Sequence, residues 1–172
     1  FLVKDAKIFI GNDNTQKIFS EIKKLKVFIH QTNFFKKEKI NFKKILINDA
    51  NFLVKGKDLK ILNESILKKF SNKKIKIKNN IIFFKNTNDD IITIIKIPEV
   101  NFFYDEIRLL NLFNLKGKVF KTPIKFNLEQ NISSKKNQKI YFESRKVNLK
   151  IENDAIKESK DQSKGVNTIS VF

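Results

Sequence analysis

Most of this chain alternates apolar and polar residues with a period of two, in runs rich in Ile, Val and Phe that are separated by Asn, Asp, Gly and Lys. Such alternation is typical of β-strands, and the intervening residues are common in turns. The spacing of Ile18, Ile22 and Leu25 also fits a helix. The alternation of Leu25, Val27 and Ile29 favours a strand there. The pattern predicts a mainly β protein with strands at 2–11, 18–30, 40–55, 74–86, 91–105, 112–130 and 139–152.

One segment instead favours a helix. Leu59, Leu62, Ile66 and Phe70 recur at spacings of three and four, and Asp58 suits the N-cap position that precedes them. We therefore expect one short α-helix over residues 58–70. It should pack against an edge or an end of the sheet.

The composition changes near the end of the chain. Residues 153–165 carry few apolar side chains and many charges, which favours a flexible polar loop, and residues 166–172 resume the alternation as the start of a further strand. Residues 1–152 form the β-rich segment that contains the helix. Because the sequence opens on Phe1, inside an alternating run, we expect it to be an internal fragment of a longer protein.

Four segments share an internal repeat in which the apolar positions change parity by one residue. The copies are Phe1/Val3 then Ala6/Ile8/Ile10, Ile45/Ile47 then Ala50/Phe52/Val54, Ile75/Ile77 then Asn80/Ile82/Phe84, and Ile95/Ile97 then Val100/Phe102/Tyr104. A one-residue change would turn the second half of each strand to the wrong face unless a bulge or bend absorbs it. Bends are thus expected at Lys4-Asp5, Asn48-Asp49, Lys78-Asn79 and Pro98-Glu99.

These patterns together predict a bent, twisted antiparallel sheet of the open β-groove type. Successive strands should pair, with connections mostly of hairpin length. The plainer alternative is that any β-rich chain with many apolar residues shows such coincidences.

The chain is strongly basic, with 36 Lys and Arg against 18 Asp and Glu and a net charge of +18. Only Arg108 and Arg145 are arginines, although arginine is the residue that favours bidentate phosphate binding. Lys, Asn, Ile and Phe all have A- and T-rich codons, so nucleotide bias accounts for part of the charge. The positive net charge indicates that the binding partner is anionic.

Residues that carry catalysis are sparse. His30 is the only histidine, there is no cysteine, and the four glycines are isolated, so we expect no metal, no cofactor and no catalytic residues. The adjacent carboxylates at 89–90 and 105–106 fit solvated hairpin turns. No stretch approaches the ~20 apolar residues of a membrane-spanning helix. We expect a non-enzymatic protein.

The segments KKILINDANFLVKGKD, KKIKIKNNIIFFKNTNDD and VNFFYDEIRLLNLFNLKGKVFKTPIKFNLE resemble the repeated strand units of AsmA-like proteins, the bacterial envelope proteins that include the TamB and YhdP types. The resemblance covers residues 1–152. It implies a periplasmic β-groove anchored to the inner membrane by a segment outside this sequence. It also implies a role in phospholipid transfer or outer-membrane biogenesis, with phospholipid or a membrane surface as partner.

In such a groove one face would be apolar enough to shelter acyl chains. The candidate lipid-facing residues come from the second half of the repeat: Ala50, Phe52, Val54, Ile82, Phe84, Phe102 and Tyr104. The alternative is a basic β-domain that binds nucleic acid or another polyanion. Lysines spread over nearly every strand, with arginine almost missing, argue against it. Lysines on the outside and a bare apolar concave face would favour lipid, whereas lysines and Phe gathered on the concave face would favour nucleic acid.

Overall fold

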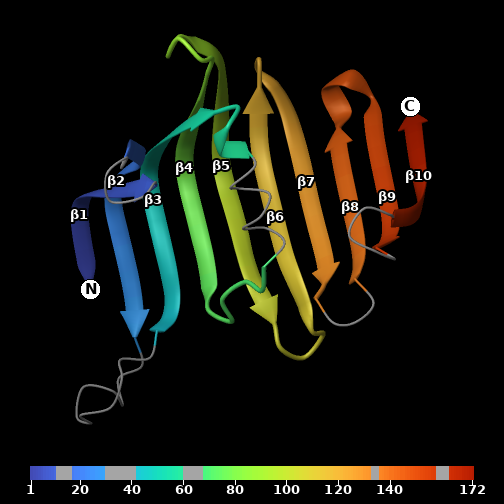
Figure 1. The fold of residues 1–172 in the computed structure, drawn as a ribbon, viewed down its shortest axis with the longest axis horizontal. Coiled ribbons are helices and arrows are strands. Elements are labelled where there is room, and N and C mark those ends of the chain that lie inside the picture. Colours follow the sequence, from blue (N-terminus) through green and yellow to red (C-terminus); the bar gives the residue numbers. More distant parts are fainter. Residues whose placement is uncertain (11–16, 30–41, 60–67, 133–135, 158–162) are drawn as a thin grey trace.

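A computed structural model describes residues 1–10, 17–29, 42–59, 68–132, 136–157 and 163–172. Ten strands form one open sheet in sequence order, and the edge strands β1 and β10 each pair on one side only (Figure 1). The predicted mainly β, open-groove fold is confirmed. The strands are β1 Leu2–Ile10, β2 Lys17–Ile29, β3 Phe42–Lys55, β4 Lys74–Lys85, β5 Ile91–Asp105, β6 Leu110–Val119, β7 Thr122–Asn131, β8 Lys136–Ser144, β9 Leu149–Lys157 and β10 Ser163–Val171.

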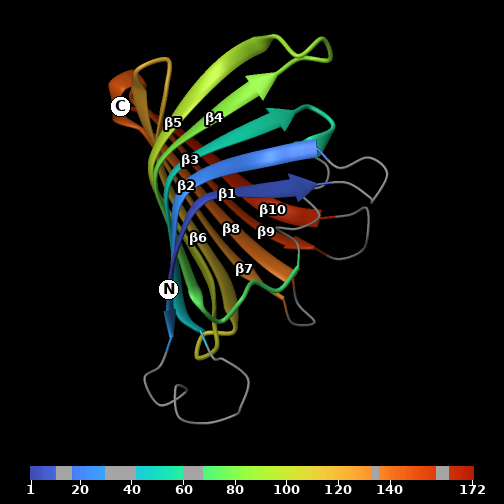
Figure 2. The same ribbon diagram turned by 90° about the vertical axis from the view of Figure 1, so that its left-hand side faces the viewer.

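The sheet curls so that one face is concave, as the edge-on view in Figure 2 shows. Asp5, Asp49 and Asn79 have φ values of 53°, 55° and 55° in the middle of β1, β3 and β4. Asp and Asn tolerate this left-handed conformation better than other residues with a side chain. These are three of the four bends that the repeat predicts, and each turns the following apolar residues back to the concave face.

The fourth predicted bend is a β-bulge in β5. Lys96 pairs with Lys118, while Glu99 pairs with Lys116, so two residues of β5 face one residue of β6. The extra residue absorbs the parity change. Pro98 suits this position because a bulge needs no regular ladder hydrogen bond from it.

The same bend explains the ambiguous spacing of residues 18–29, which form strand β2. Ile22 pairs with Ala50 and Lys24 pairs with Asn48, with Lys23 between them at the level of the bend. The apolar parity shifts from Ile22 to Leu25, which mimics a helical spacing. The strand interpretation is confirmed.

Hairpins join most neighbouring strands, and the exception is β3 and β4, which pair in parallel. A parallel pair needs a connection that returns along the whole strand, and residues 56–73 make it. Asp58 begins a helical turn there, residues 60–67 lie outside the described part of the chain, and Lys68 to Phe70 are not helical. Most of the predicted helix 58–70 is therefore not described. Its last residues lie over a face of the sheet, at β5 and β6, rather than at an edge.

Turns divide two of the predicted strands. Residues 112–130 form β6 and β7 because Phe120 and Lys121, with φ values of 47° and 65°, make a two-residue turn. Residues 139–152 contain a short 3₁₀ turn, Arg145–Val147, followed by Asn148 at a φ of 51°. Neither turn contains Gly or Pro.

The prediction of a flexible loop at residues 153–165 is corrected by the structure. Residues up to Lys157 belong to β9 and those from Ser163 to β10, and residues 158–162 are outside the described chain. Side-chain polarity suggested a loop, but the ladder depends on backbone pairing. Polar side chains also pair across strands, since Asn153 Nδ2 donates to Asn167 Oδ1 at 2.7 Å.

The acidic pairs that were expected in turns are found there. Asp105 Oδ1 accepts hydrogen bonds from the backbone N–H groups of Ile107 and Arg108 at 3.0 and 3.1 Å. Asp89 lies in the β4–β5 turn at a φ of 70°. The prediction for His30 lies outside the described residues.

Candidate functional site: an apolar concave face

An unbroken row of apolar residues crosses the concave face from β1 to β10. Each residue is the cross-strand partner of the next: Val3, Leu25, Ile47, Ile77, Val100, Leu115, Phe126, Phe142, Ile151 and Ile169. Exposure rises towards the edges, from 9% at Ile47 to 67% at Ile169. The row is apolar in every strand because the bends keep the parity aligned, although one strand pair is parallel.

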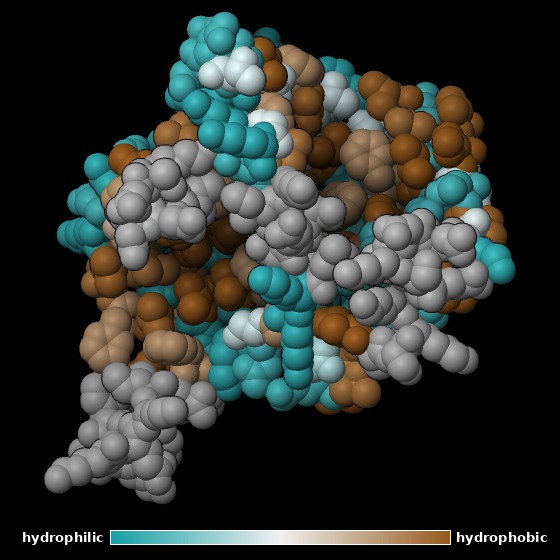
Figure 3. Space-filling model, viewed as in Figure 1, coloured by the Kyte–Doolittle hydropathy of each residue, from teal (hydrophilic) through white to brown (hydrophobic). Residues whose placement is uncertain are grey.

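A second row beside it adds aromatic side chains. Phe102 stacks on Phe113 with ring centroids 6.2 Å apart, and Phe113 meets Phe126 edge-on at 6.0 Å. These ring contacts make the apolar surface continuous across β5, β6 and β7. Figure 3 shows the concave face, where hydrophobic side chains cover much of the left-hand side and the upper right, with hydrophilic ones at the top and in the lower middle.

All the predicted lipid-facing residues lie on this face, in two groups. Ala50, Phe52 and Val54 follow the bend in β3, and Phe52 and Val54 are level with Ile82 and Phe84 of β4. Ala50 and Val54 are buried, whereas the three larger side chains of this group are partly exposed. Phe102 and Tyr104 form the second group, on the other side of the bend.

The second group is covered by the chain itself. We call Lys68 to Ser71, which runs over β5 and β6, the crossing segment. Its Phe70 ring meets the Phe102 ring edge-on at 5.6 Å, and Lys69 Nζ lies 4.0 Å from the centre of the Tyr104 ring. The Tyr104 N–H donates to Ser71 O at 2.8 Å. The crossing segment therefore takes the place that a ligand would need above Phe102 and Tyr104.

Asn111 holds the crossing segment in place. This side chain of β6 is fully buried on the concave face. Its Oδ1 accepts from the Phe70 N–H at 2.9 Å, and its Nδ2 donates to Lys68 O at 2.8 Å. Sequence reasoning missed this residue. The signal was present, because Asn111 is the one polar residue in phase with Phe113 and Leu115.

The concave face becomes polar at one corner. Asn111 pairs with Gln130, and Gln130 pairs with Gln138. The row of cross-strand partners that begins at Phe102 and Phe113 ends on β9 and β10 at Asn153 and Asn167. Gln130 is buried. The apolar surface left open is therefore bounded on one side by the crossing segment and on another by amide side chains.

Lys69 of the crossing segment lies over the concave face, whereas the ion pairs of the described strands lie on the opposite, convex face or in the turns. Glu99 accepts from Asn101 at 2.7 Å and pairs with Lys76 at 3.0 Å, and these contacts lower the pKa of its carboxyl. The hydrogen bond from Lys55, at 2.6 Å, lowers the pKa of Asp89. Both carboxylates stay ionised and paired at neutral pH, so neither is poised for proton transfer.

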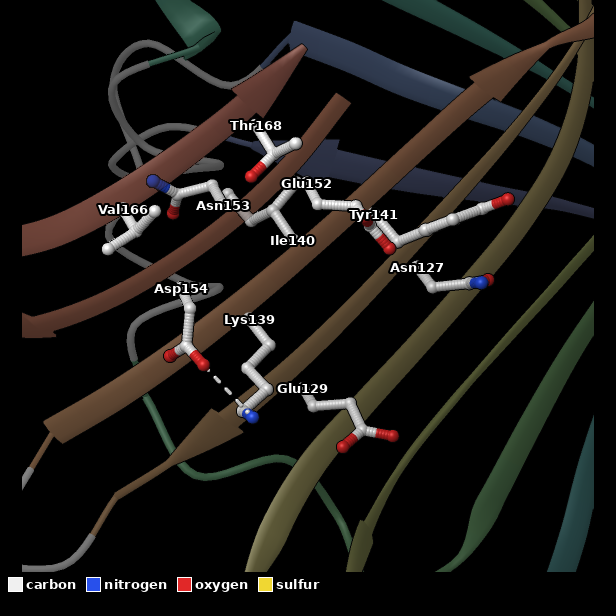
Figure 4. Close-up of a pocket in the computed structure, with 10 residues that line it drawn as sticks. All are labelled: Asn127, Glu129, Lys139, Ile140, Tyr141, Glu152, Asn153, Asp154, Val166 and Thr168. Atoms are coloured by element: carbon white, nitrogen blue, oxygen red, sulfur yellow. Dashed lines mark ion pairs between the residues drawn. The ribbon is translucent and has the colours of Figure 1, made fainter. Parts of the chain in front are cut away.

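A shallow hollow of about 400 Å³ lies on the convex face of β7 to β10 (Figure 4). Carboxylates line it, and each has a basic partner. The ion pairs are Lys139–Asp154 at 3.0 Å, Arg108–Glu129 at 2.9 Å and Lys150–Glu152 at 3.1 Å. Paired, solvated carboxylates give no nucleophile or acid–base pair, so this hollow does not support catalysis.

Within the described ranges, no helix is long and apolar enough to cross a membrane, and no three or more His, Asp or Glu side chains gather to hold a metal ion. No protein-family model matches the chain, and no curated protein matches it in sequence. The fold and its concave face are those of a single open, curled β-sheet.

Proposed function

We propose that this chain is a non-enzymatic segment of an AsmA-like envelope protein whose concave face shelters the acyl chains of phospholipid, for lipid transfer or outer-membrane biogenesis. The observation that carries the proposal is the apolar row across all ten strands. Soluble proteins rarely leave a large continuous apolar surface exposed unless it binds something. The inner-membrane anchor and the periplasmic location belong to the same proposal.

The distribution of charge supports lipid over nucleic acid. In the central rows of the concave face the side chains are apolar or amide, whereas the lysines of the same strands point to the convex face. A phosphate-binding groove would need cations inside it. The crossing segment contacts Phe102, Tyr104 and Asn111, which lie on the other side of the bend from the five lipid-facing candidates that follow it.

The test is phospholipid binding by the full chain, followed by mass spectrometry of extracted lipid and by displacement of a fluorescent phospholipid. Phe52→Lys and Ile82→Lys, on the concave face, should weaken binding by about tenfold or more, because each places a charge among acyl chains. Leu53→Lys and Ile81→Lys are matched controls, since these neighbours point to the convex face of the same two strands. They should leave binding within about threefold.

Ile82→Trp keeps the face apolar but fills it, and it should also weaken binding if acyl chains occupy the groove. This variant separates a loss of lipid binding from a folding defect caused by a buried lysine. Circular dichroism checks the fold of all five variants. The proposal is wrong if the full chain carries no lipid and binds none, and tight, salt-sensitive binding of a single-stranded oligonucleotide would replace it.

A further inference from the structure

One part of the convex face is dominated by lysine, and another part mixes lysines with carboxylates. Three rows of cross-strand partners run over it. They are Lys4–Lys24–Asn48–Lys78–Glu99–Lys116–Lys125–Glu143–Lys150–Ser170, Leu2–Lys26–Leu46–Lys76–Asn101–Asn114–Asn127–Tyr141–Glu152–Thr168, and Phe28–Lys44–Lys74–Phe103–Leu112–Glu129–Lys139–Asp154–Val166. Every acidic residue of the three rows lies on β5 to β9. The positions of these three rows on β1 to β4, which we call the lysine patch, carry lysine and no acid, and Glu21 of β2 lies in the next row, paired with Lys7.

Like charges face each other directly within the lysine patch. Lys4 is opposite Lys24, and Lys44 is level with Lys74. Directly opposed like charges destabilise a sheet. By contrast, Lys125, Lys139 and Lys150 on the other part of the convex face each pair with a carboxylate.

Most of the lysine patch lacks internal compensation. Lys4, Lys24, Lys26 and Lys78 make no ion pair with any described residue. Lys76 is the exception, because it reaches across to Glu99 of β5. An arrangement of unpaired, facing lysines that is unfavourable for the isolated sheet fits a surface whose counter-charges come from outside.

We propose that the lysine patch docks the protein on an anionic lipid membrane. Lysines near such a surface are attracted to its headgroups. The same patch exposes apolar side chains, with Leu2 52% and Phe28 43% accessible, which suits the boundary between headgroups and acyl chains. Arginine forks, which grip phosphates bidentately, are absent from it, so a membrane fits better than nucleic acid.

The experiment is flotation of the full chain with vesicles of phosphatidylglycerol in phosphatidylcholine, compared with phosphatidylcholine alone. The wild type should bind the anionic vesicles and lose them as salt rises. Replacing Lys4, Lys24, Lys26 and Lys78 together by Gln should weaken binding by about tenfold or more. A matched control removes the same charge from exposed lysines without ion pairs in the other half of the chain: Lys116, Lys118, Lys121 and Lys146 to Gln. The control should lose less than about threefold.

Equal losses in the two variants would overturn the inference, because binding would then follow net charge and not the lysine patch. Failure of the wild type to bind anionic vesicles, or preference for a single-stranded oligonucleotide over them, would also overturn it. The inference does not rest on the groove. Loss of fluorescent phospholipid binding with intact flotation would refute the proposed function alone, and the reverse result would refute the docking surface alone.

Discussion

The two halves of the sheet share one apolar row but differ in shape and in charge. β1 to β5 carry all the bends, at Asp5, Asp49 and Asn79 and at the β5 bulge, whereas β6 to β10 continue in constant register. The lysine patch lies on the convex face of β1 to β4, whereas the convex face of β6 to β10 mixes lysines with carboxylates. One apolar row therefore runs over bent strands, where the bends keep the apolar parity aligned, and over unbent strands, where the register is constant, so the row does not depend on the charge pattern of the convex face.

The largest difference in burial along the apolar row is between the core cluster of the first half and the edge strand of the second half. Ile47 lies 9% exposed in the core cluster with Ile22 and Ala50, whereas Ile169 occupies the same row on edge strand β10 at 67% exposure. Ile47→Ala should lower the free energy of unfolding by about 2–4 kcal/mol, because it leaves a cavity. Ile169→Ala should cost less than about 0.5 kcal/mol. Urea denaturation of both variants measures this, and similar costs would mean that the edge strand is covered in solution.

The next largest loss of stability is expected for the contact between the two halves, which Asn111 makes with the crossing segment. Asn111 of β6 satisfies Phe70 N and Lys68 O, which arrive from the β3–β4 connection. Asn111→Ala would leave two partly buried backbone groups without this partner and should destabilise the protein by about 1–3 kcal/mol. Asn114→Ala, an exposed asparagine of the same strand, should change little. Amide hydrogen exchange at Phe70 should speed up in Asn111→Ala only. Unchanged exchange would show that Asn111 does not hold the crossing segment.

The bend gives a smaller effect that is confined to the first half. Asp49→Val puts a β-branched residue at a φ of 55° and should cost about 1–2 kcal/mol, whereas Asp49→Gly relieves the strain and should be near neutral. Asn114→Val, in unbent β6, should be tolerated or slightly stabilising. Thermal unfolding compares the three. If Asp49→Val and Asn114→Val behave alike, the left-handed residue is not what bends β3.

The bends are also where sequence reasoning did best. A bend is visible in the sequence because the apolar residues after it are shifted by one position relative to those before it. Ile47 is followed by Ala50, three residues later, instead of by an apolar residue two or four residues later. The turn at Phe120–Lys121 and the strand nature of Asn153 left no such trace, since backbone conformation and pairing, not side-chain polarity, decide them.

The candidate site was predicted in part for the same reason. The face of Phe52 and Ile82 follows from periodicity. The covering of Phe102 by Phe70 does not, because it depends on where the β3–β4 connection passes. The lysine patch needs the register of β1 to β4 to be known before its rows can be assembled.

The smallest expected effect lies where the two charge patterns meet. Glu99 of β5 is the first carboxylate that the lysine patch reaches, and the hydrogen bonds from Asn101 and Lys76 lower its pKa. Since the pKa in the folded state is below that in the unfolded state, Glu99 stabilises the fold above its unfolded pKa, and this contribution is lost as the pH falls through the folded value. The stability difference between the wild type and Glu99→Gln should therefore be largest near neutral pH and shrink on acidification.

Urea denaturation of both proteins at a series of pH values measures that difference, with Glu21→Gln as the control. Glu21 lies 3.9 Å from Lys7 in a solvated pair, so its replacement should give a smaller difference in stability. A difference for Glu99→Gln that stays constant with pH would mean that the lysine patch gains nothing from the first acid beside it. The boundary between the two halves would then be one of shape alone.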